Sequence, residues 1–260
     1  MNLQLYEILP SLQPFISMIC TMDCDQDADL RPVRVLPDAC VELFLSYTSP
    51  PVALIEDRLY VNSIVTSRMS RAVDVRMRKG AGCLAVCFLP GMAHYFFKPK
   101  MQELSDVVVP LSHLWPGMVA ELEDRLAMAA TNQARVAMLQ QYLLQKLVIE
   151  KEDRQVTYCL NQIALCDGSI TVQALTAATG LSQRHLSRRF QQCVGLSPQA
   201  YIRVSRFIRS LAHLKKYPAV SLTEIGYDSG YYDQSHFNRE YKVFTGYTPG
   251  EVASAPHILC

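Results

Sequence analysis

The sequence predicts an α+β protein: an N-terminal antiparallel β-barrel with two helices, followed by an all-α domain with two helix-turn-helix motifs. Three observations lead to this prediction. Residues 33–90 hold short, β-branched runs punctuated by Pro and Gly, with no helical pattern between them. From Pro116 onward, apolar residues recur at helical spacing. Near the C-terminus, one pattern of apolar, Gly and Pro residues occurs twice, 51 positions apart.

The length and the distribution of charge indicate two domains, 1–150 and 151–260. The chain has 260 residues, 50% of them hydrophobic, which is enough to bury two modest cores. The first part carries 13 Lys/Arg and 16 Asp/Glu, whereas the second carries 12 and 8. The positive balance of the second part indicates a polyanion partner, and a solvated helix surface explains the charge alone equally well. The charged stretch 150–155 has no apolar anchor and is interpreted as the linker.

The strands of the N-terminal part are expected in its β-branched and alternating segments. These segments are 40–47, 59–67, 72–80 and 82–90. Because no helical pattern of 10–15 residues separates them, an antiparallel barrel or sandwich is favoured over a doubly wound sheet. A short helix after Pro90 would close one end of the barrel.

Two longer helices are expected next. The first covers 116–130, and the second follows Thr131, whose hydroxyl can cap it. The second helix carries an apolar stripe that includes Val136, Leu139 and Leu143. Packing on the chain's own barrel explains this stripe, and so does pairing with a second subunit, so both interpretations stay open.

Beyond Val156 the pattern is helical almost to the end of the chain. Helices are expected at 157–166, 172–180, 183–194 and from Pro198 to about Lys216. Gly180 supplies a left-handed C-cap for the second of these helices. Pro198 suits the start of the last one, because the N–H that proline lacks has no partner in a first turn.

Two copies of a helix-turn-helix unit account for the repeat. Leu186, Phe190, Gly195 and Pro198 recur as Phe237, Tyr241, Gly246 and Pro249. In each copy a Gly-containing turn precedes a capped second helix, whose two large apolar residues four positions apart form the buried face. Ser182 caps the second helix of the first copy, and Asp233 caps that of the second copy.

The opposite face of each second helix carries the candidate DNA-binding residues, because long donors there can reach base edges in a major groove. In the first copy these are Gln183, Arg184, Ser187 and Arg188, with Arg189 expected to contact phosphates. In the second copy these are Gln234, Ser235, Asn238 and Arg239, with His236 at the edge of the face as a packed or phosphate-contacting residue.

The helix between the two copies has a length that suits this use. Nineteen residues, from Pro198 to Lys216, span about 28 Å at about 1.5 Å per residue. Successive major grooves on one face of a duplex lie about 34 Å apart. We therefore expect the two units to read adjacent grooves of one duplex. The alternative is a duplicated packing motif that binds protein and not DNA.

Residues 156–252 resemble the DNA-binding domain of the AraC/XylS family of bacterial transcription regulators. The resemblance is carried above all by the second copy, SLTEIGYDSGYYDQSHFNREYKVFTGYTP. It implies seven helices, with two helix-turn-helix units joined by the long helix. It also implies that the base-reading positions are Arg184, Ser187, Arg188, Gln234, Ser235, Asn238 and Arg239. Gly226 stands where the family usually has alanine, which should slightly weaken that helix.

The N-terminal part is similar, less specifically, to the cupin-like β-barrel domain that precedes this module in the family. The similarity is carried by RVLPDACVELFL, FLPGMAHYFF and ELSDVVVPLSHLW. It implies that the domain senses a small-molecule effector, dimerises, or does both. The residues that would bind an effector stay unassigned, as do the metal ligands and catalytic residues, for which we expect none.

The sequence thus predicts a transcription regulator without enzymatic activity or cofactor. Its expected partners are double-stranded DNA, a small-molecule effector and a second copy of the chain, and RNA polymerase is a candidate. We expect a cytoplasmic protein without membrane contact, because no leader-like segment or apolar run of 18 residues is present and the nine cysteines fit a reducing compartment.

One alternative is a DNA-binding domain fused to a cysteine- or metal-dependent DNA repair or redox-sensing domain. Such a domain needs thiols that cluster around a metal or react together. Cys83 and Cys87 lie in one expected strand, about 13 Å apart at about 3.3 Å per residue, which is too far to share a metal ion.

Overall fold

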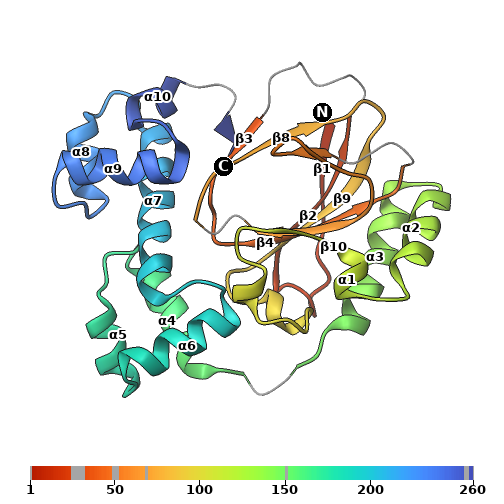
Figure 1. Ribbon diagram of the computed structural model, residues 1–260, viewed down its shortest axis with the longest axis horizontal. Helices are drawn as coiled ribbons and strands as arrows, with labels where there is room; N and C mark the ends of the chain where they lie inside the picture. The colour runs from red at the N-terminus through yellow and green to blue at the C-terminus, as the bar shows by residue number, and fades with distance from the viewer. Residues whose placement is uncertain are drawn as a thin grey trace.

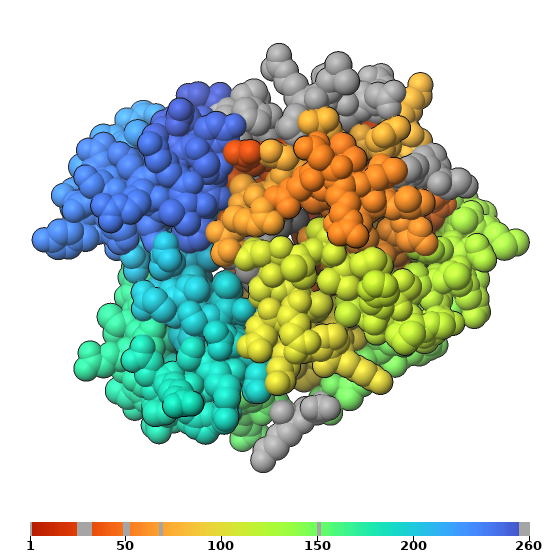
Figure 2. Space-filling view, in the orientation of Figure 1, coloured from red at the N-terminus to blue at the C-terminus, as the bar shows by residue number. Residues whose placement is uncertain are grey.

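The protein consists of a sheet part, residues 2–149, and a helical part, residues 152–254, which pack side by side (Figure 1). We describe the fold from a computed structural model. It describes residues 2–24, 33–48, 53–67, 70–149, 152–254 and 258–259. Figure 2 shows the helical part, in blue and cyan, against one side of the sheet part. The predicted domain boundary between residues 150 and 151 lies outside the described residues.

The first sheet has six antiparallel strands in the order β1-β2-β9-β4-β7-β10. Its strands are β1 (Asn2–Tyr6), β2 (Ile16–Asp23), β4 (Val41–Ser46), β7 (Ile64–Ser67), β9 (Gly82–Phe88) and β10 (Val108–Pro110). The central strands β9, β4 and β7 are almost entirely buried, and this burial includes the polar residues Glu42, Thr66 and Ser67. The predicted strand 59–67 is interrupted at Val61–Ser63, so its two halves belong to different sheets.

The second sheet has five strands in the order β11-β3-β8-β5-β6. Its strands are β3 (Val33–Val35), β5 (Ala53–Ile55), β6 (Arg58–Tyr60), β8 (Val73–Met77) and β11 (Ile258–Leu259). All pairs are antiparallel except one: β11, from the C-terminus of the chain, pairs in parallel with β3. The helical part therefore sends its last described residues back into the sheet part.

The two sheets face each other across a small apolar core. Ile55 of the second sheet packs there with Ile64 and Cys83 of the first. The other face of the six-stranded sheet is covered by α1 (Leu111–Leu114), α2 (Val119–Met128) and α3 (Asn132–Lys146), seen at the right of Figure 1. Leu43 of β4 and Leu139 of α3 belong to the larger of the protein's two described hydrophobic cores, and neither has any exposed surface.

Helix α3 packs on the chain's own sheets. Thr131 caps it by accepting a hydrogen bond from the backbone of Ala134, as predicted. Val136 and Leu143 of its apolar stripe are buried, and Gln140 accepts a 2.7 Å hydrogen bond from the backbone N–H of Leu9. The stripe is thus covered within one chain, which supports the first of the two interpretations left open above.

The helical part contains seven helices within residues 152–254, the number that the resemblance implies. They are α4 (Arg154–Leu165), α5 (Val172–Thr179), α6 (Gln183–Cys193), α7 (Pro198–Lys216), α8 (Leu222–Asp228), α9 (Gln234–Thr245) and α10 (Pro249–Ser254). Asp153 caps α4, so this helix begins inside the stretch interpreted as a linker. The predicted fold class, an N-terminal antiparallel sheet structure followed by a helical domain with two helix-turn-helix motifs, is confirmed.

The short helix expected after Pro90 is wrong in type and extent. The structure has a single 3-10 turn, η1, at Ala93–Tyr95, and a second one, η2, at Met101–Glu103. The aromatic residues of this segment pack into the core instead of lying along one face of a helix: Phe96 and Phe97 are 4% and 3% exposed. The burial of these consecutive rings explains why helical spacing does not continue here.

Candidate nucleic-acid interface

The first helix-turn-helix unit consists of α5, a turn at Gly180, and α6. Gly180 adopts φ +68°, the left-handed conformation predicted for it, and the hydroxyl of Ser182 accepts a hydrogen bond from the backbone of His185 at the start of α6. Leu186 and Phe190 have no exposed surface. The cap and the buried pair together orient the rest of α6.

The outward face of α6 carries exposed long side chains. Gln183, Arg184 and Arg188 are exposed, and Ser187 is half-buried beside them. Two guanidinium groups one turn apart on an exposed helix face are suited to contact base edges or phosphates. The side chain that sequence reasoning assigned to phosphate contact, Arg189, lies elsewhere.

Arg189 is bound inside the protein. Its Nε donates a 2.6 Å hydrogen bond to Asp153, its Nη2 pairs with the same carboxylate, and its Nη1 donates to Gln155. The Arg189 and Asp153 side chains are 23% and 21% exposed. This pair joins α6 to the start of α4. Contact with a phosphate would require Arg189 to leave three hydrogen bonds, so Arg184 and Arg188 are the better candidates in this unit.

The second unit repeats the arrangement with α8 and α9. Ile225 is 2% exposed, and Phe237 and Tyr241 have no exposed surface. Asp233 caps α9 through a 2.7 Å hydrogen bond from the backbone of His236. On the other face, the residues predicted to read bases are at least partly accessible. Gln234, Ser235 and Arg239 are exposed, and Asn238 and His236 are half-buried.

His236 lies at the edge of this face, as predicted, and is partly packed. Its ring meets that of Tyr231 edge-on, with centroids 5.3 Å apart. Its Nε2 is 3.9 Å from Glu240, a carboxylate 4% exposed that also pairs with Arg203 of α7. These contacts orient the imidazole toward its own unit.

Three arginines of helix α7 contact the elements around it. Arg203 pairs with Glu240 of the second unit, and Arg209 lies 3.6 Å from Asp167, in the turn between α4 and α5 that leads into the first unit. Between them, Arg206 donates a 3.4 Å hydrogen bond to the carbonyl of Gly168 and lies over the ring of Tyr231. The three arginines therefore connect α7 with the second unit and with the turn that leads into the first unit.

The turn after α4 packs directly on the backbone of α7. A Cβ atom on Gly168 would lie 2.8 Å from both the carbonyl oxygen of Ile202 and the nitrogen of Arg206. On the other side, Gly230 lies so close to Ser169 that a Cβ there would be 2.9 Å from its hydroxyl. The sequence predicts glycine at such turns, but it does not predict that the turn between α4 and α5 packs against the second unit.

The cysteine chemistry of the alternative hypothesis finds no support in the structure. Among the described residues there is no group of three His, Cys, Asp or Glu side chains that could hold a metal ion. Burial raises the pKa of the Cys83 thiol to about 12 and that of Cys193 to about 11. A thiol whose pKa is raised is a poor nucleophile and a poor redox sensor at neutral pH.

The reactivity of the Cys193 thiol tests whether burial raises its pKa. Burial and the negative charge of Asp153 raise its thiol pKa from 9.0 to about 11, against the opposing effect of Arg189. At pH 7.5 the folded protein therefore holds about a hundredfold less Cys193 thiolate than the unfolded chain. We expect alkylation by iodoacetamide, followed by peptide mass spectrometry, to be slower by at least this factor than in urea. Equal rates would contradict the assigned environment.

Comparison with known proteins identifies the helical part. A family described as a helix-turn-helix domain matches residues 175–255, and a domain family of unknown function, DUF6597, matches residues 6–110. The F1 operon positive regulatory protein of Yersinia pestis is 34% identical over 87 residues, 34% of this chain and 29% of that protein. The HTH-type transcriptional activator RhaS of Escherichia fergusonii is 30% identical over 84 residues, 32% of this chain and 30% of that protein.

The chain carries a helix-turn-helix domain of the AraC type at residues 175–255. It spans about three tenths of the length of the curated relatives that it matches. Among solved structures, ToxT of Vibrio cholerae superimposes with a TM-score of 0.45 at 12% identity, over 98% of both chains. By name RhaS is a transcriptional activator and the F1 operon protein is a positive regulatory protein, and neither matching family is described as an enzyme family. None of the helices in the described ranges has the length and apolar character needed to cross a membrane.

Gly226 is the position at which this AraC-type domain departs from the usual alanine, and the structure shows that alanine would fit. A Cβ there would lie 3.4 Å from the ring of Phe237, an ordinary contact. We therefore expect Gly226→Ala to stabilise the protein by about 0.5–1 kcal/mol in urea unfolding, because glycine is a poor helix former.

The matched control for Gly226→Ala is Gly230→Ala. Gly230 has φ +81°, and its Cβ would meet Ser169 at 2.9 Å. This substitution should instead destabilise by about 1–2 kcal/mol. Stabilisation by both substitutions, or by neither, would contradict the local geometry of α8 and the turn that follows it.

Proposed function

We propose that this AraC-type regulator binds double-stranded DNA in a sequence-specific manner, with α6 and α9 in successive major grooves of one duplex. The observation that supports it most is the duplication: a capped second helix, a buried pair and an exposed polar face occur at both ends of α7. The three arginines of α7 connect the second unit with the turn that leads into the first unit, which supports the fixed relation that simultaneous contact with one duplex requires.

The DNA-contacting residues that we propose are the exposed and half-exposed polar residues of the two second helices. They are Gln183, Arg184, Ser187, Arg188, Gln234, Ser235, Asn238 and Arg239, with His236 at the margin. The guanidinium groups are suited to guanine edges or phosphates, and the amides to adenine. Arg189 holds α6 to α4 and orients this face without reaching it.

We further propose that the sheet part senses a small-molecule effector and that the protein acts as a dimer. The division into a sensing part, 1–150, and a DNA-binding part, 151–260, remains our proposal. Contacts between the parts provide a route for control: Ser105 near η2 donates a 2.9 Å hydrogen bond to the carbonyl of Gly195, at the turn between α6 and α7. A conformational change in the sheet part would thus alter a contact with the end of the first unit.

Binding to DNA is tested by selecting bound sites from random duplexes and titrating the best site at several salt concentrations. A protein that neutralises several phosphates loses affinity steeply and linearly in log[salt]. We expect such a slope, together with an affinity for the selected site at least about 10³-fold above that for random DNA. Equal affinity for both duplexes would contradict sequence-specific recognition. Light scattering of the same sample tests the dimer.

A further inference from the structure

The second helix-turn-helix unit is attached to the five-stranded sheet at one defined place. Arg34 of β3 donates a 3.2 Å hydrogen bond to the carbonyl of Thr245, at the end of α9, and lies over the ring of Tyr247. The backbone N–H of Ala72 donates a 3.1 Å hydrogen bond to the carbonyl of Phe244. We call this contact, between Arg34 or Ala72 and residues 244–247, the seam.

A pocket of about 290 Å³ lies beside the seam and shares residues with it. It is lined by Arg34, Leu54, Glu56, Asp57, Ala72, Asp74 and Arg76. In the sheet, Arg34 pairs with Asp74 and Leu54 pairs with Arg76, so these four side chains share the outer face. The volume is near the low end of the range for ligand sites, about 300–1,000 Å³, which suits a molecule of amino-acid size.

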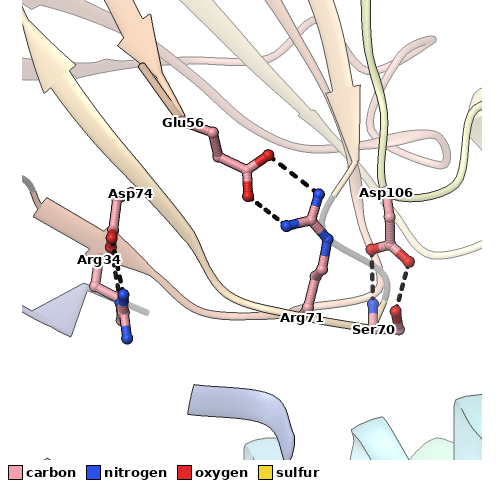
Figure 3. Close-up of polar contacts among 6 residues, drawn as sticks. All are labelled: Arg34, Glu56, Ser70, Arg71, Asp74 and Asp106. Carbon is pink, nitrogen blue, oxygen red and sulfur yellow. Dashed lines mark hydrogen bonds and ion pairs between the residues drawn. The ribbon is translucent and has the colours of Figure 1, made fainter. Parts of the chain in front are cut away.

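Three of the five charged groups that line the pocket are already neutralised within the protein. Arg34 binds Asp74 through two hydrogen bonds of 2.7 and 2.8 Å. Arg71, just outside the pocket, binds both carboxylate oxygens of Glu56. Figure 3 shows these two pairs, with Ser70 and Asp106 beside them. These pairs leave one negative and one positive group, Asp57 and Arg76, neither of which has an ion-pair partner among the described residues.

The turn that carries the negative group is strained. Glu56 and Asp57 form the two-residue connection between β5 and β6, with φ +47° and φ +62°. Such a turn ordinarily uses Asn-Gly, because residues with a longer side chain are less stable at positive φ. Two carboxylates therefore occupy positions where turn stability alone would favour other residues. Strain of this kind is concentrated at binding sites, where side-chain chemistry decides the residue.

We propose that this pocket binds a small zwitterion of the free amino-acid class, with Asp57 receiving its ammonium group and Arg76 its acidic group. A ligand of a single charge would leave one of these two groups unpaired. Because Arg34 and Asp74 line the same pocket and Arg34 also holds the end of α9, an occupied pocket alters how the second unit is held. The effect of an occupied pocket on the second unit rests on the proposed function, whereas binding of the amino acid to the pocket does not.

The test uses the full chain and a panel of the twenty free amino acids, measured by thermal shift and isothermal titration calorimetry. The matched single-charge probes are the decarboxylated amine and the deaminated acid of each amino acid that binds. We expect at least one amino acid to bind, with each single-charge probe at least tenfold weaker. No binding by any amino acid, or equal binding by a single-charge probe, would overturn the proposal.

Two variants separate the pocket from the rest of the surface. Asp57→Asn keeps a residue that tolerates a left-handed backbone, and Arg76→Gln changes an exposed side chain, so both should fold. Each should weaken amino-acid binding at least tenfold. Arg78→Gln, an exposed arginine just beyond β8 that does not line the pocket, should leave it unchanged. Equal effects of all three would assign the binding to general surface charge.

The link to DNA is measured by repeating the duplex titration with the amino acid that binds. We expect its affinity for the selected duplex to change at least threefold in the parent chain and not in Asp57→Asn. If the chain bound the amino acid but no duplex, the proposed DNA binding would be wrong and the proposed amino-acid site would be supported. If the chain bound DNA but no member of the panel, the amino-acid site would be wrong and the DNA binding would be supported.

Discussion

Replacing Gly168 with alanine is expected to destabilise the protein by about 2–5 kcal/mol. The left-handed backbone of this residue, φ +73°, costs any other L-residue about 1–2 kcal/mol. In addition, the new Cβ would lie 2.8 Å from two backbone atoms of α7, at Ile202 and Arg206. A helix backbone cannot move aside as a flexible side chain can, so overpacking adds about 1–3 kcal/mol.

The same change at Gly180 separates these two contributions. Gly180 has φ +68°, but a Cβ there would meet nothing within 4 Å. Gly180→Ala should therefore cost only the backbone contribution, about 1–2 kcal/mol. Urea unfolding followed by circular dichroism at a helical wavelength measures both. Equal losses in the two variants would contradict the close packing of the α4–α5 turn on α7.

Gly168→Ala should also weaken DNA binding, for a reason that stability alone does not supply. At the turn that carries Gly168, Arg206 of α7 contacts both the Gly168 carbonyl and the ring of Tyr231 in the second unit. If this turn is pushed away from α7, the two recognition helices lose their defined relation. We expect the variant, measured well below its unfolding temperature, to bind a duplex with both subsites more weakly while keeping its affinity for either subsite alone.

Removing the guanidinium of Arg188 or Arg239 is expected to weaken binding to the selected duplex by about 1–3 kcal/mol, roughly 5- to 150-fold. Both side chains are exposed and lie on the outward faces of α6 and α9. Because neither forms an ion pair within the described part of the chain, replacement by alanine should leave stability almost unchanged. Titration at several salt concentrations measures the loss.

The salt dependence tells which group each arginine contacts. Loss of a phosphate contact should lower the slope of log K against log[salt] by about 1 and weaken binding to all sequences alike. Loss of a base contact should relax discrimination at one or two base pairs. Arg78→Ala, an exposed arginine of the sheet part, serves as the control for net charge. If Arg188→Ala bound the selected site like the parent chain, our placement of α6 on DNA would be wrong.

Local signals made the helical part largely predictable from the sequence. Ser182 and Asp233 each cap the helix for which they were predicted, and Gly180 and Gly246 each end one in the left-handed conformation. Capping depends on residues within one turn of the helix end, so a short stretch of sequence contains all the information. The same holds for the buried pairs four residues apart.

Contacts over long sequence separations were not predictable. Arg189 was expected on DNA, yet it is held by Asp153, which lies 36 residues away. The strand β11 was not expected, because its partner β3 comes from the opposite end of the chain. A basic residue has the same local pattern whether it contacts solvent, DNA or a carboxylate, so only the folded chain distinguishes these roles.

The sequence by itself determined the order of the longer helices, the two helix-turn-helix units and the residues on their outward faces, because periodicity, caps and turn glycines act over a few residues. Only the tertiary structure decided how the two units are joined through α7, that Arg189 is engaged within the protein, and that the pocket lies at the seam. Each of these depends on side chains brought together by the packing of distant segments: Arg34 and Thr245, for example, are 211 residues apart in the chain.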